Sequence, residues 1–83
     1  MITFEIPLDE NWVQIVNNED YLLQNKTDKT VFLKAQATIP LDDTATLAMN
    51  ENEWINSALL SGVIWAKADS TPDSVNAVIT VAK

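Results

Sequence analysis

The sequence predicts an all-β fold, a small antiparallel β-sandwich or barrel of seven to eight short strands. Two observations favour this fold. Apolar and polar residues alternate at period two in several short segments, and turn-forming residues separate these segments at regular spacing while glycine occurs only once. The 83 residues are enough for a single β domain, residues 1–83, with no room for a second core.

The first two predicted strands cover residues 2–6 and 12–16. In the first, three apolar residues alternate with Thr and Glu, and Pro7 ends the strand because proline cannot donate to a ladder. In the second, we expect Val13 and Ile15 to point inward. Asn and Asp in residues 17–20 predict a turn, since both tolerate left-handed backbone.

The middle of the chain predicts a hairpin. Residues 21–25 and 31–38 flank a polar segment that would form its five-residue tip. We expect alternate apolar residues of the second arm to share one face: Val31, Leu33, Ala35 and Ala37. Residues 44–49 alternate again and predict a further strand, with Ala45, Leu47 and Met49 inward.

Residues 50–62 fit two interpretations. Asn50 could cap a helix, with Glu53 completing a capping-box-like pattern and Gly62 lying past the end. Alternatively, a turn precedes an extended segment around Trp54. Because the neighbouring elements are all short strands, we favour the extended interpretation.

The closing strands are predicted at residues 63–68 and 75–82, joined by a loop at 69–74. The first of them is apolar on both faces, which is typical of a central or covered strand. We therefore expect Trp65 in the core. In the last strand, four residues are expected to line the core: Val75, Ala77, Ile79 and Val81.

The composition argues against catalysis and metal binding. The chain lacks His, Cys and Arg, which removes the usual general base, the strongest nucleophile, the common transition-metal ligands and the bidentate phosphate clamp. We expect no enzyme, no cofactor and no metal. Asp42 and Asp43 could in principle act as acid and base or bind Ca²⁺ with Glu51 and Asn50, but a solvated loop is the simpler interpretation.

The net charge of −7 disfavours nucleic acid and anionic membranes as partners. Solubility explains this charge most simply, and a basic partner surface is the alternative. We expect no secretory signal and no membrane span. Without a secretory signal, the sequon that begins at Asn25 is better explained as an ordinary turn.

Four segments of the chain together resemble the sequence of a known family. They read YLLQNK at residues 21–26, VFL at 31–33, LSGVIWAKAD at 60–69 and VITV at 78–81. This outline resembles small β-sandwich structural proteins of tailed bacteriophages, either capsid decoration (cement) proteins or related tail and fibre modules.

The resemblance implies a virion structural protein, most simply a capsid decoration protein assembled in the host cytoplasm. It implies as partners the major capsid protein or another virion protein, and a homo-oligomer on the particle, with a trimer favoured. No catalytic motif defines the group. The alternative function is a carbohydrate- or receptor-binding module of a phage tail or fibre, which an exposed Trp or Tyr21 beside Asn or Asp would favour.

An interface is expected at large apolar residues with polar neighbours, because tryptophan is enriched where proteins dock. Residues 1–7 could serve as an N-terminal arm or edge strand with unpaired backbone groups. The candidate interface residues are Met1, Ile2, Phe4, Trp12 and Trp54.

Overall fold

The computed structural model describes residues 2–42, 44–68 and 77–83 and forms eight strands, with no helix among these residues. In chain order the strands are β1 (Thr3–Pro7), β2 (Val13–Asn17), β3 (Leu22–Gln24), β4 (Val31–Ala35), β5 (Leu47–Met49), β6 (Trp54–Asn56), β7 (Val63–Ala68) and β8 (Val78–Ala82). Met1, Asp43, Val75 and the predicted loop at 69–74 lie outside the described residues.

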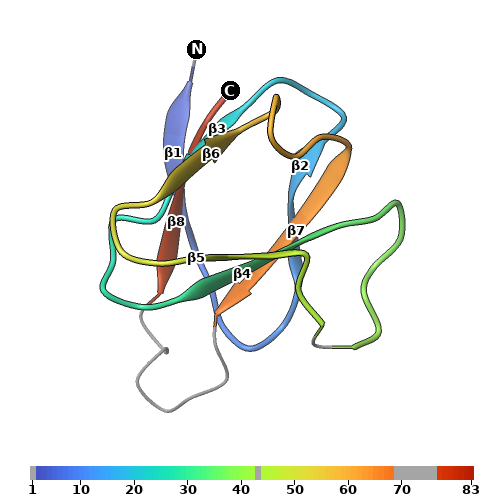
Figure 1. Ribbon diagram of the computed structural model, residues 1–83, viewed down its shortest axis with the longest axis horizontal. Helices are drawn as coiled ribbons and strands as arrows, with labels where there is room; N and C mark the ends of the chain where they lie inside the picture. The colour runs from blue at the N-terminus through green and yellow to red at the C-terminus, as the bar shows by residue number, and fades with distance from the viewer. Residues whose placement is uncertain (1, 43, 69–76) are drawn as a thin grey trace.

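The strands form two four-stranded antiparallel sheets that pack face to face (Figure 1). The β1 sheet has the order β1-β8-β3-β6, and the β2 sheet has the order β2-β7-β4-β5. The predicted small all-β sandwich is therefore confirmed. The two ends of the chain lie side by side, because Ile2 and Lys83 exchange two backbone hydrogen bonds of 2.6 and 2.8 Å.

The core lies between the sheets and consists of the inward-pointing residues of the alternating strands. The central strands β7 and β8 supply much of it, as expected for the segment that is apolar on both faces. The fully buried aliphatic side chains from the two sheets are Val16, Leu23, Val31, Leu33, Ile64, Ile79 and Val81.

The predicted hairpin is wrong. β3 pairs with β6 and β8, whereas β4 pairs with β5 and β7, so the two arms belong to different sheets. Asn25 explains the corner between them. Its buried side-chain amide donates to the carbonyls of Lys29 and Met49 at 2.6 and 3.0 Å, and its Oδ1 accepts from the Thr27 backbone N–H at 3.0 Å. This Asx-type turn sends the chain from one sheet to the other, and it confirms that the sequon is an ordinary turn.

Residues 50–62 contain no helix, as favoured: a turn at 51–52 precedes the extended β6, and a second turn follows at 57–59. Asn52 takes a positive φ of 66°, and the chain then enters β6. The bond expected of a capping box does form, because the Asn50 N–H donates to Glu53 Oε1 at 2.6 Å, but it closes a turn instead of a helix.

A β-bulge in β2 changes the predicted pattern of that strand. The register shifts between Gln14 and Val16, so Ile15 and Val16 are both buried while Val13 is only half-buried. Other differences lie at strand ends: β5 is shorter than predicted, Ala45 and Leu47 are half-buried, and Ala37 is exposed beyond β4.

The expectation that Trp65 lies in the core is wrong. Its neighbours Ile64 and Ala66 point inward, so Trp65 points to the outer side of the β2 sheet, where it is half-buried. Its indole Nε1–H donates to the Gln36 carbonyl at 2.9 Å. The ring therefore anchors the segment that follows β4.

Candidate functional site

The outer face of the β1 sheet carries the most exposed tryptophan. In antiparallel pairs, directly opposite residues share a face, and the core residues Leu23 and Val81 show which face is inner. The outward residues form two rows across the four strands. We call these rows the Trp54 face: Glu5, Thr80, Gln24 and Trp54 in one row, and Thr3, Ala82, Leu22 and Asn56 in the other.

The Trp54 face combines buried residues on its central strand β8 with exposed side chains on β3 and on the edge strand β6. Trp54 is 60% exposed and Leu22 is 38% exposed. Thr80 and Ala82 also point outward but are buried beneath their neighbours, so the middle of the face is already largely withdrawn from water. A sheet face with a buried middle and a large exposed aromatic ring beside it is typical of a surface that another molecule covers.

Polar side chains lie within the Trp54 face and at its ends. Gln24 lies directly opposite Trp54, and Glu5 ends the same row on β1. Asn56 ends the second row, where its Oδ1 accepts from the Ala58 N–H at 3.0 Å. A surface that combines a large exposed aromatic ring with polar side chains is typical of a protein interface.

A shallow hollow that no residue of the Trp54 face lines lies beside the residues that follow β2 and β6. Its lining is polar and acidic: Asn18, Glu19, Asp20, Ser57, Ser61 and Gly62. Glu19 accepts a hydrogen bond from Lys83 Nζ at 2.8 Å and another from the Asn17 N–H, and these bonds lower the pKa of its carboxyl. The lining contains no aromatic ring on which a sugar could stack.

Tyr21 cannot serve as an exposed sugar platform. Its side chain is buried, and its hydroxyl donates to the Leu60 carbonyl. Burial also raises the pKa of this hydroxyl. Tyr21 therefore holds residues after β6 against the core, and Trp54 is the most exposed aromatic ring available for stacking.

Of the N-terminal candidates, Phe4 lies on the edge strand β1 and Ile2 lies directly before it. Ile2 is 72% exposed and Phe4 is 36% exposed. Lys83 Nζ lies 5.6 Å from the centroid of the Phe4 ring and also bonds Glu19. Met1 lies outside the described residues.

Trp12 is not brought together with Trp54. It is half-buried over the outer side of the β2 sheet, where its Nε1–H donates to the Asp42 carbonyl at 2.7 Å. Lys67 Nζ lies 5.5 Å from the Trp12 ring and 5.9 Å from the Phe32 ring. Trp12 thus packs within its own chain, on the opposite side of the sandwich.

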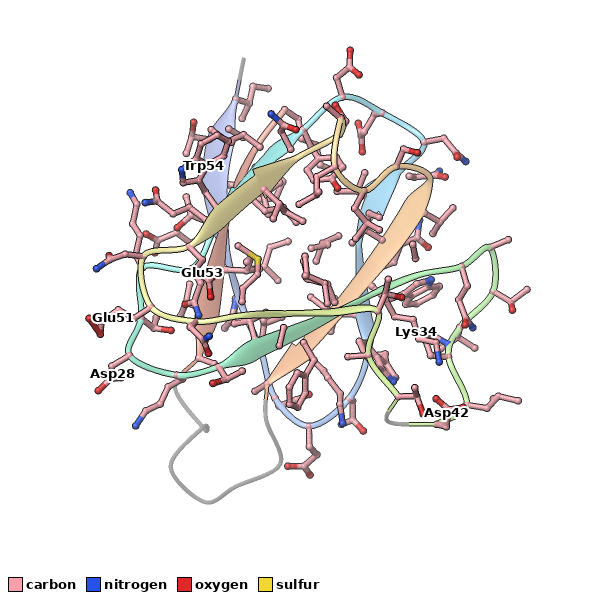
Figure 2. The ribbon with its side chains drawn as sticks, in the orientation of Figure 1. Asp28, Lys34, Asp42, Glu51, Glu53 and Trp54 are labelled. Atoms are coloured by element: carbon pink, nitrogen blue, oxygen red, sulfur yellow. The ribbon has the colours of Figure 1, made fainter. Side chains whose placement is uncertain are left out.

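Of the acidic residues considered for catalysis or calcium, Asp43 lies outside the described residues, and Asp42 and Glu51 do not converge (Figure 2). Asp42 is exposed, and its carboxylate accepts from Lys34 Nζ at 2.8 Å and from the Thr44 N–H, which lowers its pKa. Figure 2 shows the Lys34–Asp42 pair on the side of the molecule opposite Trp54 and Glu51. Among the residues that the structure describes, no three of His, Cys, Asp or Glu could jointly hold a metal ion.

Of the eight residues of the Trp54 face, sequence analysis named only Trp54 as a candidate, although Thr3 and Glu5 fall within the candidate arm at residues 1–7. It missed the outward residues of β3, Leu22 and Gln24. The alternation of Tyr21 and Leu23 with these residues does indicate which side chains of β3 point outward. However, their proximity to Trp54 depends on which strands pair.

The chain matches no protein-family model, no curated protein and no solved structure. Across the described parts of the chain, no helix has the length and apolar character needed to cross a membrane.

Proposed function

We propose that this protein is a virion structural protein of a tailed bacteriophage, a capsid decoration protein that docks on the major capsid protein or another virion protein. The observation that carries the proposal is the exposed Trp54, with the exposed Leu22 diagonal to it, on the outer face of the β1 sheet. A broad face with an aromatic anchor suits a partner surface better than a small substrate.

The charge and the resemblance support the same proposal. A net charge of −7 keeps a repeated surface protein soluble and favours a basic partner. The resemblance to phage structural proteins implies that the particle is a virion and that the chain forms a trimer on it. We expect that trimer to form on the assembled particle rather than between free, like-charged chains.

The first test is whether the chain belongs to a particle at all. Mass spectrometry of purified virions should detect it, and cryo-electron microscopy should place it on their surface with the Trp54 face against a virion protein. A chain found only as a cytosolic monomer of a cell would overturn the proposal.

The second test asks whether the Trp54 face is the docking surface. Binding of Trp54→Ser to particles that lack the protein should be weaker by about tenfold or more, as for an interface hot spot. The matched control is Leu41→Ser, because Leu41 is 96% exposed and lies in the segment between β4 and β5. Equal binding by both variants would exclude this face.

A carbohydrate-binding module is the second candidate, and one observation favours it. The exposed Trp54 ring lies across from the amide of Gln24, so stacking and hydrogen bonding could occur at one place. A glycan array with millimolar soluble ligands tests it. If no glycan binds and no soluble ligand quenches the tryptophan fluorescence, this candidate is excluded and the docking proposal is unaffected.

A further inference from the structure

The edge strand β1 has one side that no described strand covers. On its other side, the Leu8 N–H donates to the Ala77 carbonyl at 2.9 Å, and Ile2 exchanges two bonds with Lys83. Leu8 and Ile2 are an even number of residues apart, so their backbone groups point to the same side. Because hydrogen-bonding direction alternates along an antiparallel strand, even-numbered residues of β1 face β8. The backbone groups of the odd-numbered residues therefore face outward.

Two residues, Thr3 and Glu5, each offer one N–H and one carbonyl along this uncovered edge. Pro7 occupies the next outward position. Proline lacks an N–H, so its place on the uncovered side removes no bond to β8. The hydrogen-bonding stretch of the edge is therefore short and ends at Pro7.

The side chains of β1 make the same edge apolar on its inner side. Ile2, Phe4 and Ile6 point toward the β2 sheet, since their partners on β8 belong to the core. Ile2 and Phe4 nevertheless stay exposed, and Ile6 is only half-buried. An edge strand with this composition carries no lysine that would discourage strand pairing.

We propose that a second copy of this chain covers the edge, with the two β1 strands antiparallel about a two-fold axis at Phe4. Two-fold symmetry makes the pairing reciprocal, so each contact occurs twice. The outward groups allow three such registers: Thr3 opposite Thr3, Glu5 opposite Glu5, or Thr3 opposite Glu5.

The mixed register uses every outward N–H of Thr3 and Glu5 without setting like charges against each other. Glu5 opposite Glu5 sets like charges against each other, which is destabilising. Thr3 opposite Thr3 leaves the Glu5 groups of both copies without a partner among the described residues. Thr3 opposite Glu5 uses both donors and both acceptors of each copy, which gives four hydrogen bonds.

The mixed register also matches the apolar side chains. It sets Phe4 opposite Phe4 of the second copy in a non-hydrogen-bonded pair, where side chains approach most closely. Ile2 of each copy then lies opposite Ile6 of the other copy. Six apolar side chains, three from each copy, thereby form one continuous row. The β1 sheets of the two copies join into one sheet.

The first experiment uses single cysteines, since the natural chain has none. With the axis at Phe4, the two sulfurs of Phe4→Cys lie across from each other. The sulfurs of Ile2→Cys are about 13 Å apart, because four residues at about 3.3 Å each separate their positions. This separation exceeds the reach of a disulfide.

On a non-reducing gel, we expect Phe4→Cys to form covalent dimers at least about tenfold faster than Ile2→Cys under the same oxidant. Equal rates for the two variants, or a faster rate for Ile2→Cys, would overturn the register.

The second experiment leaves Phe4 intact. Sedimentation equilibrium of the natural chain should show twice the mass of one chain at high concentration. Glu5→Pro removes an outward N–H from each copy, hence two of the four bonds, without touching the β8 ladder. The dimer dissociation constant should rise about tenfold or more, while the circular dichroism spectrum of the fold is retained.

The control is Glu5→Gln, which keeps the N–H and removes a negative charge. It should dimerise as well as the natural chain or better, and added salt should strengthen the natural dimer by screening the repulsion of two acidic chains. A natural chain that is monomeric at all concentrations, or that has the mass of three chains, would overturn the proposal. A dimer that Glu5→Pro leaves unchanged would overturn it too.

Discussion

The side-chain amide of Asn25 donates to the backbone carbonyl of Met49 at 3.0 Å, and this bond ties the end of a strand in one sheet to a strand in the other. The same amide holds the Lys29 carbonyl, and the whole side chain is buried. A polar side chain in this position is stabilising only because all its hydrogen-bonding groups have partners.

Replacing Asn25 with Ala should lower the free energy of unfolding by about 3 kcal/mol. The change leaves the buried carbonyls of Lys29 and Met49 without the amide, and each unsatisfied group is unfavourable by about 1–3 kcal/mol. Urea denaturation monitored by tryptophan fluorescence measures the loss. Asn11→Ala, at an exposed position, serves as the control and should change stability little; an equal loss in both variants would contradict the role assigned to Asn25.

Replacing Gly62 with Ala should also destabilise the fold, by about 1–2 kcal/mol, because Gly62 has a φ of 101°. A new Cβ would have space, since its nearest contact is Asn18 Oδ1 at 3.9 Å, so the whole effect comes from the backbone. Thermal unfolding of Gly62→Ala and the neighbouring Ser61→Ala tests this. A stable Gly62→Ala would show that the turn readily adopts another conformation.

The Lys34–Asp42 pair should contribute stability that disappears in acid. The bond to Lys34 holds the pKa of Asp42 below its ordinary value of 3.8. The contribution is therefore complete above pH 3.8 and is lost as the pH falls through the lower pKa of the folded state. A double-mutant cycle with Lys34→Gln and Asp42→Asn should show coupling at pH 7 that vanishes toward pH 2; coupling that is independent of pH would refute the assignment.

The two tryptophans on opposite sides should respond differently to truncation. Trp12→Phe should lose about 1 kcal/mol of stability, because its indole N–H no longer reaches the Asp42 carbonyl. Trp54→Phe should leave stability within about 0.5 kcal/mol, since the ring is mostly exposed. Chemical denaturation of both variants provides the measurement, and a larger loss for Trp54→Phe would contradict this division. If the Trp54 face is the docking surface, Trp12→Phe should dock normally.

The amino-acid sequence by itself determined which segments are strands and which side chains of most strands point inward. This information is local, because alternate residues of a strand point to opposite faces and turn residues mark its ends. Leu23, Leu33 and Ile79 could therefore be assigned to the core, and the extended segment around Trp54 could be favoured over a helix.

Only the tertiary structure decided which strands lie beside one another. Strand pairing joins residues far apart in the chain, so β3 could turn away from β4 and pair with β6 and β8 although a hairpin was the local expectation. That pairing brings Leu22 and Gln24 beside Trp54 and creates the candidate surface. The packing of the two sheets likewise decides that Trp65 points outward, because it determines which face of the β2 sheet becomes the core.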